Sequence, residues 1–307
     1  MGLWNKLTSP IRNTSGLGRW VLLSGIIIVG FFVILAVFAN WIAPFGFAQN
    51  SADGVDFPQK AAPGGDHLMG TDGFGYDVWS RVVFGSRTAL MVIVLAVLGS
   101  LILGLVLGLI SGYVGGWLDR ILVLIMDALY AFPSLLLAIV VGFLLSEKIG
   151  AGVVSAALSL TVVYMPQYFR VVRNSTVSAR EATYVEAARA IGAPGRTVIS
   201  RYLFGNVIQS VPVIGTLNAS DALSTLAALG FLGLGIQPSD GADWGYDLSS
   251  ALEDAAAGIW WTGVFPGLAI VLVIVGLTLV GEGLNETINP TLRKRRLKKI
   301  TAEETAK

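Results

Sequence analysis

Four long stretches without a charged residue limit what this chain can fold into. They lie between Arg19 and Asp53, between Arg87 and Asp119, between Lys148 and Arg170, and between Asp254 and Glu282. A helix needs about 20 apolar residues to cross the hydrocarbon core of a bilayer. Only 13% of the 307 residues are charged, whereas soluble domains carry roughly a quarter. The sequence therefore predicts an all-α polytopic membrane protein.

Six transmembrane helices are predicted from these stretches and their neighbours. We expect them at residues 20–43, 88–112, 121–145, 153–169, 207–234 and 263–282. The first is too long for the apolar region of a signal peptide, which favours a retained signal anchor. The third and the fifth each contain a carboxylate, Asp127 and Asp221.

The basic residues divide the connecting segments into two groups. Of the 21 lysines and arginines, 17 lie in segments 1–19, 113–120, 170–201 and 283–307. Basic residues are enriched in cytoplasmic loops. Six spans with this distribution place both termini, and the segment 170–201, in the cytoplasm.

The second predicted span carries small residues at every fourth position. The row runs through Ala96, Ser100, Gly104, Gly108, Gly112 and Gly116. On a helix this spacing makes one smooth stripe, and small residues let another helix approach closely in a membrane. The stripe fits packing within the chain, and it also fits a subunit or moving interface.

The segment 181–206, EATYVEAARAIGAPGRTVISRYLFGN, is charged and rich in alanine. Thr183 and Glu186 have the spacing of a capping box, and a competing pair lies five residues upstream. Gly192 is typical of a helix end, and Pro194 suits the first turn of a second helix. These signals predict a helix–turn–helix elbow on the cytoplasmic side.

Such an elbow is suited to docking in a groove on another protein. Ala187, Ala188 and Ala190 would be its small contacts, with Glu186 and Arg189 at the rim. A solvated loop with incidental helix propensity fits the composition equally well.

The elbow resembles the E-A-A-x-x-x-G pattern of bacterial ABC-importer permeases, which Ile-x-Leu-Pro follows nine residues later. The matching residues are Glu186, Ala187, Ala188 and Gly192. In place of the second part this chain has Tyr202, Phe204 and Gly205. The resemblance therefore implies an ATPase-coupling loop, but not the usual exit from the second elbow helix.

Further motifs resemble the C-type subunit of the dipeptide/oligopeptide/nickel branch of these permeases. Residues 67–90 look like its G-T-D-x-x-G-R-D-V-x-S-R signature, with Tyr76 in place of Arg. SGYVGGWLDR, DALYAFPSLLLAI, FLGLGIQP, FPGLAIVL and GEGLNETINP follow in the family's order, and Asp243-Trp244-Gly245 replaces its Ser-Trp-Gly. The resemblance covers 67–290.

This resemblance implies a type I ABC importer permease fold. Residues 67–290 would be a core of five transmembrane helices with a coupling elbow at about 174–206. Residues 1–66 would hold the cytoplasmic N-terminus, the first transmembrane helix and an external loop, and 291–307 a basic cytoplasmic tail.

The resemblance also implies a complex in a bacterial cell membrane that takes up peptides or similar small solutes. Its other members would be a B-type permease subunit, two ATP-binding cassette ATPases that hold ATP and Mg, and an external solute-binding protein. Peptides, nickel complexes, glutathione and oligosaccharides all remain open as solutes.

Residues for covalent chemistry are scarce. The chain has no cysteine, one histidine, His67, and no G-x-x-x-x-G-K-[ST] phosphate loop. We interpret His67 as an exposed loop histidine, since a metal site would need more ligands. We therefore expect no catalytic residue, cofactor, metal or nucleic acid on this chain itself.

Carboxylates within spans usually face protein or a water-filled cavity. Asp221, with Asn218 beside it, is a candidate for the translocation path, although a buried structural hydrogen bond would also account for it. Asp127 fits a structural role. Asp221 also leaves open an ion-coupled secondary transporter. A membrane receptor or scaffold without transport is a further alternative.

The predicted external loop 237–262 contains five acidic residues, no basic residue and three tryptophans. It fits an acidic surface that steers a delivery protein, and equally a plain solvated loop. The tryptophans, Trp244, Trp260 and Trp261, are expected at the membrane interface.

Overall fold

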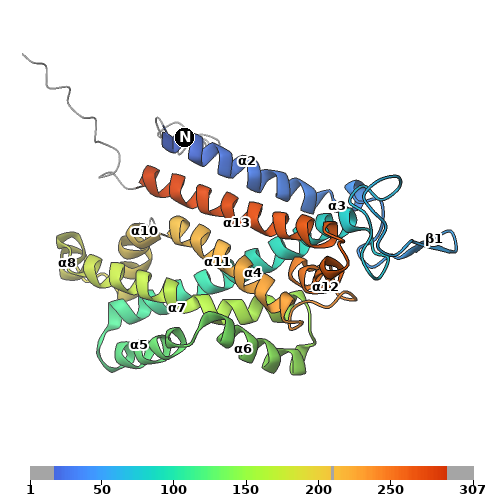
Figure 1. Cartoon of the computed structure of the whole chain (residues 1–307). Coiled ribbons are helices and arrows are strands. Elements are labelled where there is room, and N and C mark those ends of the chain that lie inside the picture. Colours follow the sequence, from blue (N-terminus) through green and yellow to red (C-terminus); the bar gives the residue numbers. More distant parts are fainter. Residues whose placement is uncertain (1–16, 209–210, 289–307) are drawn as a thin grey trace, which may run out of the picture.

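The computed structural model describes residues 17–208 and 211–288, so the predicted tail at 291–307 lies outside the described residues. Its regular structure is almost entirely helical, as Figure 1 shows. The longer helices are α2 (Leu17–Val37), α4 (Val78–Val114), α5 (Gly116–Ala131), α6 (Ser134–Ile149), α7 (Val153–Arg180), α11 (Val211–Phe231), α12 (Trp244–Ala256) and α13 (Trp261–Ile288). The short elements are α3 (Ala39–Ile42), β1 (Ser51–Ala52), β2 (Val55–Asp56), α8 (Thr183–Ala190), α9 (Gly195–Thr197), the π-helix η1 (Val198–Leu203) and α10 (Phe204–Val207).

The helices run between two ends of the molecule (Figure 1). α2 and α13 lie side by side, and α4 packs most extensively against α7. One end carries α8 and α10. The other carries α3, the antiparallel pair β1–β2 and α12. We call this second end the cap, made of residues 43–77 and 232–260. The main hydrophobic core joins α2, α4, α6, α7, α11 and α13.

Among the described residues, three helices are long and apolar enough to cross a membrane, namely α2, α4 and α13. α5 and α6 pass the same test only as a pair, and the pair is bent by 103°. The bend follows from Pro133, because a residue before proline is driven out of the helical region, and Phe132 is extended at ψ 139°. The prediction of one continuous helix at 121–145 is therefore wrong.

The stripe of small residues on α4 lies against α7. A Cβ on Gly104 would come within 2.5 Å of the Tyr168 Cβ, and one on Gly108 within 2.8 Å of the Val172 Cγ1. The Ser100 hydroxyl donates to the Thr161 carbonyl at 3.0 Å. At these positions the chain itself fills the stripe. Gly116 does not extend it, since it begins α5.

The close approach of α4 and α7 predicts a large cost for any side chain at Gly108. A leucine there would meet the Phe169 carbonyl oxygen, 2.9 Å from the new Cβ, and overpacking of this kind costs about 1–3 kcal/mol. We expect Gly108→Leu to lower the melting temperature in detergent. Gly30→Leu is the control, because no atom lies within 4 Å of a Cβ built there. Equal melting temperatures for both variants would contradict this packing.

Candidate functional site

The elbow turns at Gly192. α8 ends at Ala190, and Gly192 has φ +81°, a left-handed conformation that glycine adopts without strain. The Gly192 N–H donates to the Arg189 carbonyl at 2.9 Å, and the Ala193 N–H donates to the Ala188 carbonyl at 3.0 Å. These two bonds form a Schellman motif. The predicted helix end at Gly192 is thus confirmed.

The start of α8 differs from the sequence prediction. α8 begins at Thr183, but its N-cap is Ala182 and no side chain caps it. The proposed capping box of Thr183 and Glu186 does not form, because Thr183 already lies in the first turn instead of preceding the helix. The competing pair upstream fails as well, since Ser178 lies inside α7.

A small hydrophobic core fixes the elbow to the ends of α4 and α7. Its buried residues are Leu109, Val172, Val185, Val198, Leu203 and Val207. Burying one such side chain contributes about 1.5–3 kcal/mol. The elbow is therefore held firmly on the two central helices and would move with them.

The two faces of α8 differ sharply. Glu186 and Ala187 are exposed, and Ile191 beside the turn is 83% exposed. Ala188 is only 3% exposed and faces the elbow core, so the prediction that it is a docking contact is wrong. The Arg189 guanidinium lies 5.1 Å from the centre of the Tyr113 ring on α4. The outward surface of the elbow is thus small, partly apolar and bordered by charge.

Polar contacts below the elbow tie α7 to the junction of α4 and α5. Arg173 binds Asp119 through Nε at 2.5 Å and Nη2 at 2.7 Å. The Ser111 hydroxyl donates to the same carboxylate at 2.5 Å. Arg180 donates to the Gly112 carbonyl at 3.0 Å. Sequence reasoning missed this cluster because its members lie up to 68 positions apart.

The second part of the elbow is a continuous helical segment, α9, η1 and α10. Pro194 is the N-cap of α9 and not its first residue. A single π-helical turn, Val198–Leu203, follows; such turns occur mostly within α-helices and often at functional sites. Gly205 lies in α10, where the family pattern has proline.

The two residues proposed for a translocation path lie on different faces of α11. Asn218 is 1% exposed and faces the protein, whereas Asp221 is exposed. Asp221 shares its face with Leu217 and Ser224, which are also exposed, as expected for spacings of four and three residues. The exposed carboxylate on this apolar helix lies on a surface that the chain itself leaves uncovered.

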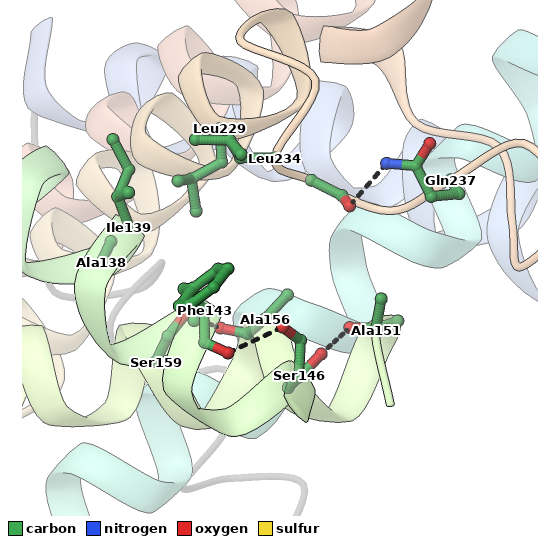
Figure 2. A pocket seen from close by; sticks show the side chains of 14 residues that line it. Ala138, Ile139, Phe143, Ser146, Ala151, Ala156, Ser159, Leu229, Leu234 and Gln237 are labelled. Carbon is green, nitrogen blue, oxygen red and sulfur yellow. Dashed lines mark hydrogen bonds between the residues drawn. The ribbon is translucent and has the colours of Figure 1, made fainter. Parts of the chain in front are cut away.

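A pocket of about 260 Å³ opens between α6, α7 and the segment after α11 (Figure 2). Figure 2 shows Leu229 and Leu234 on one wall, facing Phe143 and Ser159 on the other. No charged residue lines it, and its serine hydroxyls donate to carbonyls of their own helices. Asp221 is not among its lining residues. The pocket is therefore neutral and mainly apolar.

The chain is similar to known transport proteins. Residues 104–294 match the model of the family described as binding-protein-dependent transport system inner membrane component. The chain belongs to this family. It is 40% identical over 272 residues to the dipeptide transport system permease protein DppC of Escherichia coli, covering 88% of this chain and 89% of the relative. The match confirms the resemblance drawn from the motifs.

Of two further relatives of this permease, one again carries a dipeptide transport name and the other a glutathione transport name. A dipeptide transport system permease protein DppC of Alkalihalophilus pseudofirmus is 35% identical over 269 residues, with 88% of this chain and 85% of the relative covered. The glutathione transport system permease protein GsiD of Escherichia coli is 35% identical over 261 residues, with 85% and 83% covered.

The cap of this permease is held by a buried ion pair. Arg81, near the start of α4, binds Asp247 of α12 through Nε at 2.6 Å and Nη2 at 2.5 Å. Arg81 also donates to the Phe47 carbonyl at 2.9 Å. The two side chains are 3% and 9% exposed. Arg81 thus connects α4 to two segments of the cap, α12 through Asp247 and the loop at Phe47.

His67 is buried, which overturns its interpretation as an exposed loop histidine. Its Nδ1 lies 2.9 Å from the Asp77 carboxylate, and Asp77 also caps α4 by accepting from the Ser80 N–H at 2.8 Å. His67 therefore fixes the residue that starts α4. Within the residues the structure describes, no group of three or more potential ligands is placed to hold a metal ion.

The loop 237–262 is less exposed than its composition indicates. Asp243 and Asp254 are buried, and Lys60 binds Asp254 at 2.9 Å. Trp244 and Trp261 are buried, and their indole N–H groups donate to the backbone carbonyls of Val82 in α4 and of Thr71, respectively. Three of the five carboxylates thus fold into the cap. Only Trp260 has the exposed position expected of an interfacial tryptophan.

Burial raises the pKa of Asp72 to about 6, although the N–H groups of Tyr76 and Phe74 and the Arg81 guanidinium favour its ionised form. A folded-state pKa above the ordinary 3.8 means that this group stabilises the fold fully at low pH and loses that contribution as the pH rises through 6. We expect Asp72→Asn, whose amide oxygen can still accept both bonds, to gain stability over the wild type between pH 4.5 and 7.5. A difference in melting temperature between the two proteins that stays constant from pH 4.5 to 7.5 would contradict the expectation.

Proposed function

We propose that this chain is the permease subunit of an ATP-driven importer of the ABC class, with di- or oligopeptides as its solutes. The family match and the names of the relatives support this proposal. ATP and Mg would bind to partner ATPase subunits, since this chain has no phosphate loop. The proposed partners are a B-type permease, two ATPases and an external solute-binding protein.

The observation that carries the proposal is the elbow. Its outer surface presents Glu186, Ala187 and Ile191, while its inner surface is packed onto α4 and α7. A docked ATPase that moves would therefore displace the central helices as one unit. In this scheme Glu186, Ala187 and Gly192 form the docking turn, and Ala188 anchors it.

We also propose that the chain crosses the membrane six times with both termini in the cytoplasm. Counting the bent pair α5–α6 as one crossing, the connections alternate between the elbow end and the cap end (Figure 1). The basic segments 113–120 and 170–201 fall at the elbow end, which would then face the cytoplasm.

The translocation path would lie between this chain and the second permease. Asp221 is exposed on an apolar helix, and an uncovered carboxylate in a membrane is costly, so we place its face toward the shared path. Alternating access would follow: ATP binding opens the path toward the cap, and hydrolysis returns it toward the elbow end.

A pull-down in mild detergent from native membranes tests the proposal. We expect a second permease and ATP-hydrolysing subunits in stoichiometric amounts. These ATPases should be lost when Glu186 and Gly192 are both replaced, while the second permease stays bound. Recovery of the chain without any ATPase would contradict the proposal.

The exposed Asp221 also supports a second candidate, an ion-coupled secondary transporter. Such a transporter would take up solute under a proton or sodium gradient without ATP, and Asp221→Asn would abolish this uptake. The importer predicts instead that uptake in Asp221→Asn still requires ATP. A receptor or scaffold would show no uptake with any partner.

A further inference from the structure

A groove of about 610 Å³ runs between α2 and α4 on the outside of the helix bundle. Its walls are apolar, from Val33, Ala36 and Val37 on α2 to Leu90, Met91, Val94 and Leu95 on α4. Arg87 is the one charged residue that lines it. This volume is in the range of about 300–1,000 Å³ that small-molecule sites occupy.

Arg87 marks the membrane boundary at the cap end. It directly precedes the uncharged stretch of α4, and its guanidinium lies 3.5 Å from the Asn40 amide oxygen. Asn40 is next to Trp41, which is 79% exposed, and exposed tryptophans gather at the interface between lipid and water. The guanidinium is thus placed at the level of lipid headgroups.

From Arg87 the groove extends into the apolar part of the bundle. Leu95 lies eight residues further along α4, which at 1.5 Å per residue is about 12 Å. Half of a hydrocarbon core is about 15 Å thick. The groove therefore follows the direction and nearly the depth of one membrane leaflet.

The charge of Arg87 has no counter-ion within residues 17–208 and 211–288. Its only polar contact there is the long one to Asn40. Arg81, six residues earlier on the same helix, shows the alternative, since it is paired with Asp247. An arginine at the edge of hydrocarbon is stabilised by an anion, and its planar guanidinium matches phosphate geometry.

We propose that this groove binds a phospholipid, with the lipid phosphate on Arg87 and one acyl chain along Val37, Met91 and Val94. Exposed apolar walls that end at a cation match an acyl chain that ends at a phosphate. A transmembrane helix of a partner is about 10–12 Å across, and its apolar surface would leave the guanidinium without an anion. The groove serves as a lipid site whether or not the chain is a peptide importer.

Native mass spectrometry of the full-length chain tests this site. The protein is reconstituted in nanodiscs of phosphatidylglycerol and phosphatidylcholine. It is then released from the nanodiscs under conditions that leave fewer and fewer lipids bound to it. We expect one phosphatidylglycerol to stay bound longest. Arg87→Ala and Val94→Trp, which fills the groove, should each reduce its retention at least tenfold.

Two controls make the result specific. Arg87→Lys keeps a cation and should retain part of the binding. Leu103→Trp places the same bulk on an exposed part of α4 outside the groove and should retain all of it. Unchanged retention in both Arg87→Ala and Val94→Trp, or equal loss in Leu103→Trp, would overturn the proposal.

A cross-linking experiment separates lipid from a partner helix. The chain has no cysteine, so Val94→Cys gives a unique site for a benzophenone probe in native membranes. A covalent adduct with the mass of a phospholipid supports the proposal. An adduct with the second permease in place of lipid would overturn it, without bearing on the elbow or on transport.

Discussion

Gly192→Val is expected to reduce solute uptake by about 5- to 30-fold while membrane insertion and folding stay intact. Because Gly192 has φ +81°, a valine at this position would have to adopt the left-handed conformation, which costs about 1–2 kcal/mol. That energy corresponds to a factor of about 5–30 in the population of the turn. Since no atom lies within 4 Å of a Cβ at Gly192, the effect would come from the backbone and not from a clash.

The measurement is ATP-dependent uptake in reconstituted vesicles, together with the amount of ATPase subunit that stays bound. Gly258→Val is a matched control, because Gly258 has φ +81°, equally open surroundings and the same pair of Schellman hydrogen bonds, and it lies in the cap at the end of α12. It introduces the same strain far from the elbow and should leave uptake near the wild-type rate. Gly192→Asn should also be mild, since asparagine tolerates this conformation. Wild-type uptake in Gly192→Val, or equal loss in Gly258→Val, would remove the elbow from the coupling mechanism.

The elbow shows how far local sequence signals reach. Gly192 predicted the helix end correctly, because the left-handed turn is a property of a few consecutive residues. The side of α8 that faces inward was harder to predict. Ala187 and Ala188 are the same residue type, and only the position of Val185, Val198 and the ends of α4 and α7 decides which of them is buried.

The cap was the part least accessible from sequence. Its acidic loop has the composition of a solvated surface, yet Asp247 and Asp254 are buried beside Arg81 and Lys60, which lie more than 160 positions away. His67 is likewise buried, because the rings of Phe45 and Phe57 pack against it. In contrast, the break of the third predicted span was readable, because Phe132-Pro133 is a local signal against a continuous helix.

Arg81→Ala is expected to destabilise the protein by about 3–5 kcal/mol, because it leaves the Asp247 carboxylate buried without its counter-ion. The measured quantity is the free energy of unfolding in mixed detergent micelles, at a pH above 7. The control is Arg170→Ala. Arg170 binds Asp127 at 3.0 Å, but about half of each side chain is exposed. Removal of this ion pair should therefore lower the free energy of unfolding by about 1 kcal/mol or less.

The double variant Arg81→Met with Asp247→Leu tests whether the loss in the single variant comes from the stranded charge. Apolar side chains in place of a buried ion pair are often neutral or stabilising, so the double variant should unfold closer to the wild type than Arg81→Ala does. Some loss should remain, because the bond from Arg81 to the Phe47 carbonyl disappears in both. If the double variant instead loses more stability than Arg81→Ala, as the sum of two independent losses, Asp247 is hydrated in the absence of Arg81. The ion pair would then not hold the cap together.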